Sequence, residues 1–585
     1  MAVSSAMLGA EELAKIAILA DAPKGALKAA AKKVEWFSVP GGHALFKPGE
    51  NADSIYFLRS GVLGAFRRGA DGKMDFIGHI RAGEPVGEMA FLGGAPHTAA
   101  VFAMRDSEVV KLPRDAFDRL IKRWPTLMRS LAQMMVARMR LPRRNTPGGA
   151  SEPKVFALLA TSPTINCKYI ADELAEALGR LGRSSVIVGP EAEDSPSEWF
   201  DKLEQDHDIV LLHTPVADTH WFRLCLRQAD RLWILARPDA RPSEPLLPPD
   251  RSPARMFRLV DVILMHDVGD RVVSDGADWK RAANAERVFH WRRGNKADLD
   301  RIARTAAGRS IGLVLSGGGA RAYAHIGAIR ALHEAGIAID FAGGTSMGAI
   351  IAAGLALGWN DDEMEKNICQ AFVHSNPLDD YTLPVVALTK GRKVNQRLYR
   401  FFKDTKIENL HIPFFCVSSN LESGNAAIHY DGLLRTALRA SIALPGILPP
   451  VVIDGAVHVD GAVANNFPVD VMVNFHRGMT IGVDVARQKG LNARDFIHPP
   501  GFFGWVLRHG LHEAPPIASL LMRSGTISQG NHEDSSRQDA DILLLPDVED
   551  VELRDWKAYE IAAEAGYSDM VRTLQDGALE RLTSG

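Results

Sequence analysis

The stretch GTSMG, from Gly344 to Gly348, places Ser346 between two glycines. An apolar segment precedes it, and an unbroken run of small and apolar residues follows from Ala349 to Leu357. This order predicts a strand, a sharp turn and a buried helix. Glycines let the backbone turn tightly and leave the hydroxyl at a helix N-terminus, where aligned N–H groups favour negative charge. Ser346 is therefore a candidate nucleophile, with Gly344 and Gly348 forming its elbow.

A glycine run lies upstream, directly after the predicted apolar strand Ile311 to Leu315. Such a run can present backbone N–H groups toward a developing oxyanion. Either piece alone also fits an ordinary turn between a strand and a helix, and the two together are more specific. The candidate oxyanion-hole residues are Gly317, Gly318, Gly319 and Arg321.

Length and composition set the broad class. The chain has 585 residues, more than one hydrophobic core usually organises, so we expect three or four domains. Hydrophobic residues at 46% and charged residues at 24% are ordinary for a soluble globular protein. The net charge of -3 gives no global electrostatic case for nucleic acid. Four widely spaced cysteines fit a reducing compartment: Cys167, Cys225, Cys369 and Cys416.

The first 20 residues mix charges into an apolar background and do not resemble a signal peptide. The longest apolar stretch, Ala349 to Trp359, is too short to cross a bilayer. We therefore expect a cytoplasmic protein whose membrane contact, where it occurs, is peripheral on the inner face of a membrane.

Between Val34 and Leu112, short apolar runs alternate with glycine turns, which predicts a small antiparallel barrel or sandwich. Helical patterns follow at Arg114 to Arg123 and at Thr126 to Leu141. Strand and helix patterns then alternate from Val155, which predicts a Rossmann-like α/β domain with a parallel sheet.

The middle domain's first strand-to-helix loop, Thr161 to Asn166, lacks the glycines and lysine of a phosphate site, so we interpret the domain as a spacer. Its histidines have no metal-ligand spacing, and we expect neither metal nor cofactor. The charged segment Asp278 to Asp300 is expected to hold exposed loops and a charged helix.

An activated serine needs a base. Seven histidines of the C-terminal part are available, and none has a context that singles it out: His325, His333, His374, His411, His429, His458 and His476. A carboxylate is the better candidate. Asp460, which precedes Gly461, ends a short apolar stretch, although Asp454 before Gly455 has the same Asp-Gly pattern.

Part of the N-terminal domain resembles the cyclic-nucleotide-binding family, whose phosphate cassette joins a Gly-Glu turn to a Pro-Arg-small-small run. The matching residues are Gly87, Glu88, Met89, Ala90, Thr98 and Ala99. The resemblance implies that the glutamate accepts from the ribose hydroxyl and that an arginine pairs with the phosphate. His97 occupies the arginine position, and a neutral imidazole lacks the permanent charge and fork of a guanidinium. Nucleotide binding therefore does not follow from the resemblance, and a docking or regulatory role is the alternative.

The glycine run, the serine turn and the Asp460-Gly461-Ala462 segment together resemble the patatin-like phospholipases in content, order and spacing. The resemblance implies a Ser-Asp dyad, with Ser346 as nucleophile, Asp460 as base and the glycine N–H groups as oxyanion hole. Ala322 departs from the glycine usual after Arg321, which a backbone outside the left-handed region would tolerate. With the domain in front, the chain resembles the bacterial relatives of neuropathy target esterase.

We expect a multidomain protein: residues 1–142 cyclic-nucleotide-binding-like, 153–268 Rossmann-like, and 309–585 patatin-like with an α/β/α core at 311–485. The expected function is a serine lipid acyl hydrolase acting on phospholipid or lysophospholipid esters. The alternative is a cyclic-nucleotide-sensing or docking protein with a vestigial hydrolase domain. Two segments, Asp379 to Lys393 and Gly501 to Met522, are candidate lid or interfacial segments.

The dyad also makes a physical demand on its base. An aspartate near its ordinary pKa is a weak base toward a serine hydroxyl, so burial must raise the pKa of Asp460. Esters relax this demand, because an alkoxide leaving group needs less help from a general acid than an amine does. A dyad without histidine therefore favours ester hydrolysis over peptide hydrolysis.

Overall fold

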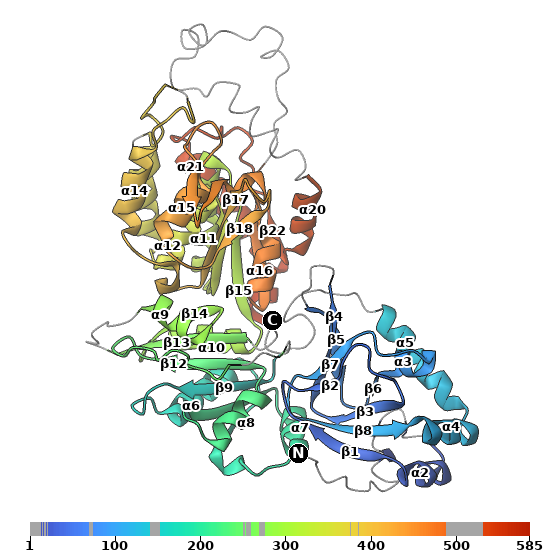
Figure 1. Cartoon of the computed structure of the whole chain (residues 1–585). Coiled ribbons are helices and arrows are strands. Elements are labelled where there is room, and N and C mark those ends of the chain that lie inside the picture. Colours follow the sequence, from blue (N-terminus) through green and yellow to red (C-terminus); the bar gives the residue numbers. More distant parts are fainter. Residues whose placement is uncertain are drawn as a thin grey trace, which may run out of the picture. The chain divides into compact units, whose positions relative to one another are not determined.

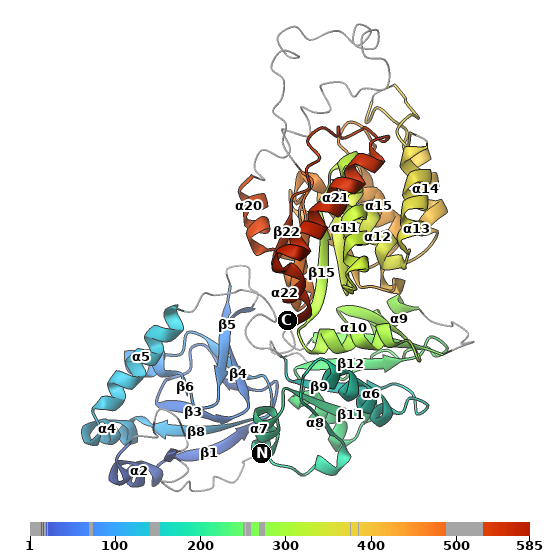
Figure 2. The same cartoon turned by 180° about the vertical axis from the view of Figure 1, so that it is seen from behind.

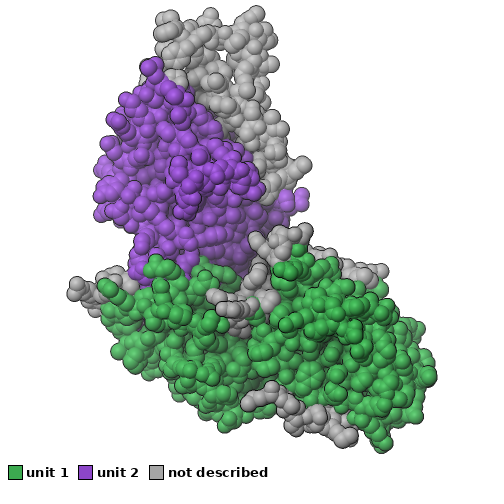
Figure 3. All heavy atoms as spheres, in the orientation of Figure 1, with its two compact units in different colours: residues 1–263, 281–286 green, residues 264–280, 287–585 purple. Residues whose placement is uncertain are grey.

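The computed structural model describes residues 22–69, 74–140, 153–249, 259–267, 275–374, 376–383, 385–486 and 530–584, with isolated residues 13, 14, 16, 19 and 252. The chain divides into two compact units (Figure 3). The first holds residues 1–263 and 281–286, and the second holds residues 264–280 and 287–585. The candidate segment Gly501 to Met522 lies outside the described residues.

The first unit begins with two four-stranded antiparallel sheets, which confirms the predicted sandwich (Figure 1). One sheet has the order β1-β8-β3-β6 and the other β2-β7-β4-β5. The strands are β1 (Glu35–Val39), β2 (Ala44–Phe46), β3 (Ser54–Ser60), β4 (Val62–Arg68), β5 (Met74–Arg81), β6 (Pro85–Val86), β7 (Ala100–Ala103) and β8 (Ser107–Pro113). The helices are α2 (Lys24–Ala31), α3 (Glu88–Gly93), α4 (Arg114–Arg123) and α5 (Thr126–Arg140).

A parallel sheet of order β10-β11-β9-β12 follows in the same unit, as the alternating pattern predicts. Its strands are nearly continuous apolar runs because helices cover both faces of such sheets. The elements are β9 (Val155–Ala160), α6 (Cys167–Arg180), β10 (Ser185–Val188), the 3₁₀ turn Pro190–Ala192, α7 (Ser197–Asp206), β11 (Ile209–Pro215), α8 (His220–Gln228) and β12 (Arg231–Ala236).

Charged pairs join the sandwich to this parallel sheet within the first unit. Arg105, which is 8% exposed, forms ion pairs with Glu204 and, at 3.0 Å, with Asp230. Asp106 next to it accepts from the Nε of Arg227 at 2.8 Å. Buried charges need such partners, since an unpaired ion in a protein interior is costly.

The segment between β12 and the hydrolase-like sheet differs from the expectation. Residues 278–300 do not form exposed loops and one helix, because a strand with five buried residues, β14, lies inside them. The strand is hidden in a charged sequence because its polar side chains have buried partners: Arg287 donates to the carbonyl of Phe475 at 3.0 Å. The elements are β13 (Leu259–His266), α9 (Gly276–Ala283), β14 (Arg287–Arg292) and α10 (Lys296–Ala306).

The second unit contains a sheet of order β19-β20-β17-β16-β15-β21-β22, with β18 also paired to β17. Strands β17, β16, β15, β21 and β22 run parallel, β18 and β20 each pair antiparallel with β17, and β19 pairs antiparallel with β20. The strands are β15 (Ser310–Leu315), β16 (Phe341–Thr345), β17 (Phe414–Asn420), β18 (Ala426–His429), β19 (Val451–Ile453), β20 (Ala456–Asp460), β21 (Gly478–Val483) and β22 (Ile542–Leu544).

Helices flank this sheet on both faces, as expected for the α/β/α class (Figures 1 and 2). α12 contacts β15, β16 and β17, whereas α16 contacts β15 and β21. The helices are α11 (Tyr323–Glu334), α12 (Met347–Leu357), α13 (Asp361–Ile368), α14 (Arg392–Phe402), α15 (Leu434–Ser441), α16 (Val469–Phe475), α20 (Gly530–Asp539), α21 (Tyr559–Thr573) and α22 (Leu579–Ser584). Short helical turns are Gly319–Ala322, Cys369–Val373, Ile407–Asn409, Gly461–Val463 and Leu574–Ala578.

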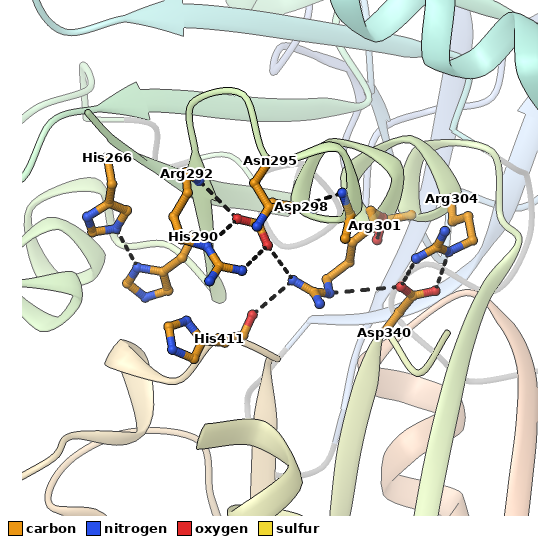
Figure 4. A network of polar contacts seen from close by, with 11 residues as sticks. His266, His290, Arg292, Asn295, Asp298, Arg301, Arg304, Asp340 and His411 are labelled. Atoms are coloured by element: carbon orange, nitrogen blue, oxygen red, sulfur yellow. Dashed lines mark hydrogen bonds and ion pairs between the residues drawn. The ribbon is translucent and has the colours of Figure 1, made fainter. Parts of the chain in front are cut away.

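A polar network at the start of this sheet aligns β15, which leads to the glycine run, with β16, which leads to the serine turn (Figure 4). Arg304 of α10 donates to both oxygens of the fully buried Asp340, at 2.9 and 2.7 Å. Asp340 precedes β16, and its carboxylate also accepts from the N–H of Ile311 in β15 at 3.1 Å. Arg301 extends the network to Asp298 at 3.5 Å. One carboxylate therefore fixes the relative start of β15 and β16.

In the part of the chain that the structure describes, no helix combines the length and the apolar character that a membrane span requires.

Candidate active site

Ser346 lies at the turn between β16 and α12, as predicted, and its backbone is strained. Its φ of 53° and ψ of −125° are rare for a residue with a side chain. The flanking glycines are required by space: a Cβ on Gly344 or Gly348 would lie 2.4 Å from the carbonyl oxygen of Leu315. The close approach of β15 therefore explains both glycines of the elbow.

Asp460 ends β20 and points its carboxylate at the serine. The hydroxyl of Ser346 donates to Oδ2 of Asp460 at 2.8 Å, and Oδ1 accepts from the N–H of Ala462 at 2.9 Å. Asp460 is fully buried, whereas Asp454, the other Asp-Gly candidate, is exposed. Burial raises the pKa of Asp460 to about 7, against the opposing effect of its two hydrogen bonds. A carboxylate that accepts a proton from serine near neutral pH needs a raised pKa, and Asp460 has one.

Two further serines hold this pair, and sequence reasoning missed both. Ser441, at the end of α15 and fully buried, accepts from the N–H of Ser346 at 2.9 Å. Ser419 of β17 donates to the carbonyl of Asp460 at 2.8 Å and accepts from the N–H of Ala464 at 2.9 Å. Ser441 therefore provides an acceptor for the N–H of the strained Ser346 turn. Ser419 joins the two ends of the turn that carries Asp460.

The glycine run lies beside Ser346. A Cβ on Gly317 would lie 3.1 Å from the Cβ of Ser346, and the N–H of Gly317 already donates to the carbonyl of Asn466 at 3.2 Å. The N–H groups of Gly318 and Gly319 donate to no acceptor among the described residues. These two donors are therefore available to a bound group.

Arg321 acts on the shape of this loop, as expected, because its Nε donates to the carbonyl of Val551 at 2.7 Å. The N–H of Ala320 donates to the carbonyl of Leu553 at 3.0 Å, so the loop is attached to residues 551–553 at two points. Ala322 has a φ of −62°, outside the left-handed region, and its methyl group causes no backbone strain. Alanine in place of glycine at this position is therefore compatible with the backbone of the loop.

No histidine among the described residues hydrogen bonds to Ser346 or Asp460. His325 is fully buried, and its Nε2 lies 2.9 Å from the carbonyl oxygen of Ser316, which starts the glycine run. Burial lowers the pKa of His325 to about 4, so the ring is neutral and donates to that carbonyl. His458 contacts the hydroxyl of Ser418 at 2.8 Å. The side chain that accepts from the Ser346 hydroxyl is therefore the carboxylate of Asp460.

The candidate phosphate cassette of the N-terminal domain contains the Gly-Glu turn, and a histidine ring lies where the family has its arginine. Gly87 has a φ of +77° and precedes α3, where Glu88 is buried and Met89 is 64% exposed. His97 is 4% exposed and stacks on Phe46, with ring centroids 3.7 Å apart and an angle of 11°.

The His97 ring also lies against Gly87, since a Cβ there would be 2.9 Å from its Cε1. Burial lowers the pKa of His97, so the ring carries no charge at neutral pH. Thr98 is exposed, and Ala99 and Ala90 are partly exposed. The structure thus gathers the predicted cassette residues without a cation at the position where the family has its arginine.

His, Cys, Asp and Glu side chains do not gather in threes suited to a metal ion within the described ranges.

Comparison with known proteins identifies both ends of the chain. Residues 313–473 match the model of the patatin-like phospholipase family, and residues 36–123 match that of the cyclic nucleotide-binding domain. An uncharacterized NTE family protein of Mycobacterium tuberculosis is 33% identical over 577 residues, which cover 95% of this chain and 94% of that protein.

The mouse patatin-like phospholipase domain-containing protein 6 is 30% identical over 520 residues. That match covers 78% of this chain and 38% of the mouse protein. Together with the serine turn, the buried aspartate and the sandwich in front of them, the long match to the mycobacterial protein shows that this chain belongs to the NTE family, with a patatin-like phospholipase domain and an N-terminal cyclic nucleotide-binding domain.

Proposed function

We propose that this protein is a serine hydrolase that cleaves the carboxylic esters of phospholipids or lysophospholipids through an acyl-Ser346 intermediate. The observation that carries the proposal is the 2.8 Å hydrogen bond from the Ser346 hydroxyl to Asp460, a fully buried carboxylate whose pKa is raised to about 7. A base with this pKa is matched to proton transfer near neutral pH. The family names of the relatives support a lipid ester as substrate.

In this mechanism the oxygen of Ser346 attacks the ester carbonyl carbon while its proton passes to Asp460. The N–H groups of Gly318 and Gly319, which lack a protein acceptor in the described chain, stabilise the oxyanion. Collapse of the intermediate breaks the bond to the alkoxide, which takes the proton from Asp460. Water then attacks the acyl group, gives its proton to Asp460, and releases the fatty acid as Ser346 regains its hydrogen.

A fluorophosphonate probe and a panel of lipid esters test this function. We expect the probe to label the wild-type protein and not Ser346→Ala, and we expect wild type alone to release fatty acid from phospholipid or lysophospholipid. Ser423→Ala removes an exposed hydroxyl that bonds to neither Ser346 nor Asp460, so it is the matched control and should keep full labelling. Labelling of Ser346→Ala as strong as wild type would overturn the assignment of the nucleophile.

We further propose that the N-terminal domain is a docking or regulatory module instead of a cyclic-nucleotide sensor. The stacked, uncharged His97 supports this reading, because a cyclic phosphate is an anion that binds best to a fixed cation. We also propose that the protein is cytoplasmic and attaches peripherally to the inner face of a membrane.

A further inference from the structure

A loop before α14 carries the two most exposed large hydrophobic side chains of the described residues. Val385 is 92% exposed and Leu383 is 87% exposed, and Val386 beside them is 66% exposed. Single exposed apolar residues are common on protein surfaces, whereas three on one short loop mark a surface for an apolar partner. The loop leads into α14, in the gold part of the chain (Figures 1 and 2).

Hydrogen bonds join the two ends of this loop at its base. Tyr381 and Thr389 form an antiparallel bridge, and the N–H of Thr382 donates to the carbonyl of Leu388 at 2.9 Å. The hydroxyl of Thr389, which is 1% exposed, donates to the carbonyl of Ile447 at 2.7 Å. A hydrogen-bonded base therefore presents the apolar tip to solvent.

Cations follow the apolar tip along the chain. From residue 390 to residue 403 the chain carries six basic residues and no acidic one: Lys390, Arg392, Lys393, Arg397, Arg400 and Lys403. All but Arg397 are exposed. Lys393 pairs with Asp379 at 2.6 Å, whereas the side chains of Lys390 and Arg392 pair with no acid in the described ranges. An apolar tip with a basic border matches the surface of an anionic bilayer, which attracts Lys and Arg and accepts apolar side chains below the headgroups.

The loop base is bonded to the segment that holds the candidate catalytic pair. The N–H groups of Leu388 and Thr389 donate to the carbonyls of Gly446 and Ile447, at 2.9 and 3.1 Å. Three residues before Gly446, the carbonyl of Ala443 accepts from the N–H of Asp460 at 2.9 Å. Ser441, which binds the Ser346 N–H, begins the same segment. A bilayer held at the loop would therefore lie against a segment that is hydrogen-bonded to both Ser346 and Asp460.

We propose that residues 381–383 and 385–393 dock this protein on an anionic phospholipid bilayer, with Leu383, Val385 and Val386 entering the interface and Lys390 and Arg392 binding the headgroup charge. The inference deepens the proposed function, because it assigns the surface from which a lipid ester would reach Ser346.

Vesicle sedimentation tests the docking without any hydrolysis. Every protein carries Ser346→Ala, so the result does not depend on the proposed reaction. The tip variant is Leu383→Ser/Val385→Ser/Val386→Ser, and the border variant is Lys390→Gln/Arg392→Gln. The matched control, Ile561→Ser/Leu421→Ser/Val473→Ser, removes three exposed apolar side chains elsewhere in the second unit. The neutral vesicles are pure phosphatidylcholine, and the anionic vesicles are phosphatidylcholine with about 30% phosphatidylglycerol.

We expect the parent to bind the anionic vesicles at least about tenfold more tightly than the neutral ones, and high salt to remove that preference. The tip variant should lose at least about tenfold in binding to anionic vesicles, since three apolar side chains no longer enter the interface. The border variant should lose about fivefold for each cation removed. The matched control should bind like the parent.

Two results would overturn the docking proposal: a tip variant that binds anionic vesicles like the parent, or a matched control that loses as much binding as the tip variant. Activity gives a second check in proteins that keep Ser346. The tip variant should hydrolyse a short water-soluble ester at the wild-type rate and lose at least about tenfold on vesicle-bound phospholipid. Equal loss on both substrates would show a folding defect in the site and would contradict docking as the role of the loop.

Discussion

The serine turn and the phosphate cassette each stand at the start of a helix, and they differ in the polar partner that each contains. In each, a glycine lies one or two positions before a polar residue at the start of a helix: Gly344 before Ser346 at α12, and Gly87 before Glu88 in α3. The serine turn has its candidate base at 2.8 Å, whereas the cassette has the neutral ring of His97 packed on Phe46. A domain can therefore have the fold of a family without the charge that the family resemblance implies, because packing and ligand chemistry depend on different atoms.

The comparison depends most strongly on Asp460. Replacing it by asparagine keeps the size of the side chain and removes the proton acceptor, so kcat/KM for ester hydrolysis should fall by about 10²–10⁴. Asp454→Asn, in the other Asp-Gly turn, is the matched control and should keep full activity, because its carboxylate is exposed. Full activity in Asp460→Asn would contradict the dyad.

Folding of Asp460→Asn can be checked by its thermal stability. Burial raises the pKa of Asp460 from 3.8 to about 7 in the folded state, so wild type loses stability as the pH rises from about 4 to 7. The asparagine variant lacks this loss, and at pH 8 it should melt no lower than wild type. A much lower melting temperature would show that its inactivity comes from misfolding.

The pH dependence of hydrolysis is the next largest effect. The ionised carboxylate is the active base, so kcat/KM should fall about tenfold for each pH unit below about 7 and level off above it. The measurement is the initial rate on a water-soluble ester between pH 5 and 9, which avoids changes in lipid packing. A flat profile through this range would show that no group of this pKa takes part in the reaction.

The sequence predicted the paired motifs because their chemistry requires particular residues beside glycines. It could not predict Ser441 or Ser419, since an ordinary serine in a helix or strand carries no signal until the chain folds. It missed β14 because Arg287 and His290 read as surface residues, while in the structure both are buried with partners. The substitution at His97 was visible in the sequence, whereas its stacking on Phe46, 51 positions away, depends on the pairing of strands.

Ser441 offers a smaller and sharper test of the serine turn. Ser441→Ala leaves the buried N–H of Ser346 without an acceptor, a cost of about 1–3 kcal/mol that relaxation of the strained turn can relieve. The nucleophile then leaves its position, so kcat and the rate of fluorophosphonate labelling should fall about tenfold with KM unchanged. Ser441→Cys keeps a weaker acceptor and should fall between wild type and alanine.

The control for Ser441, which ends α15, is another fully buried serine of the same unit. Ser310, at the opposite end of β15 from the glycine run, lies 3.1 Å from Nδ1 of His476. Ser310→Ala should lower the melting temperature and leave kcat unchanged. Equal loss of kcat in both variants would mean that Ser441 contributes only to stability.

The smallest expected effect is on the cassette side of the comparison, where we expect no binding. Calorimetry with cyclic AMP and cyclic GMP at concentrations up to about 1 mM should give no saturable heat, because His97 is neutral and its face is covered by Phe46. Saturable binding by wild type would contradict this expectation and restore the sensor hypothesis. His97→Arg introduces a permanent charge but must also displace the Phe46 ring, so it should not create tight binding alone. If His97→Arg/Phe46→Ala gains binding that His97→Arg lacks, the stacked ring, and not only the missing charge, closes the cassette.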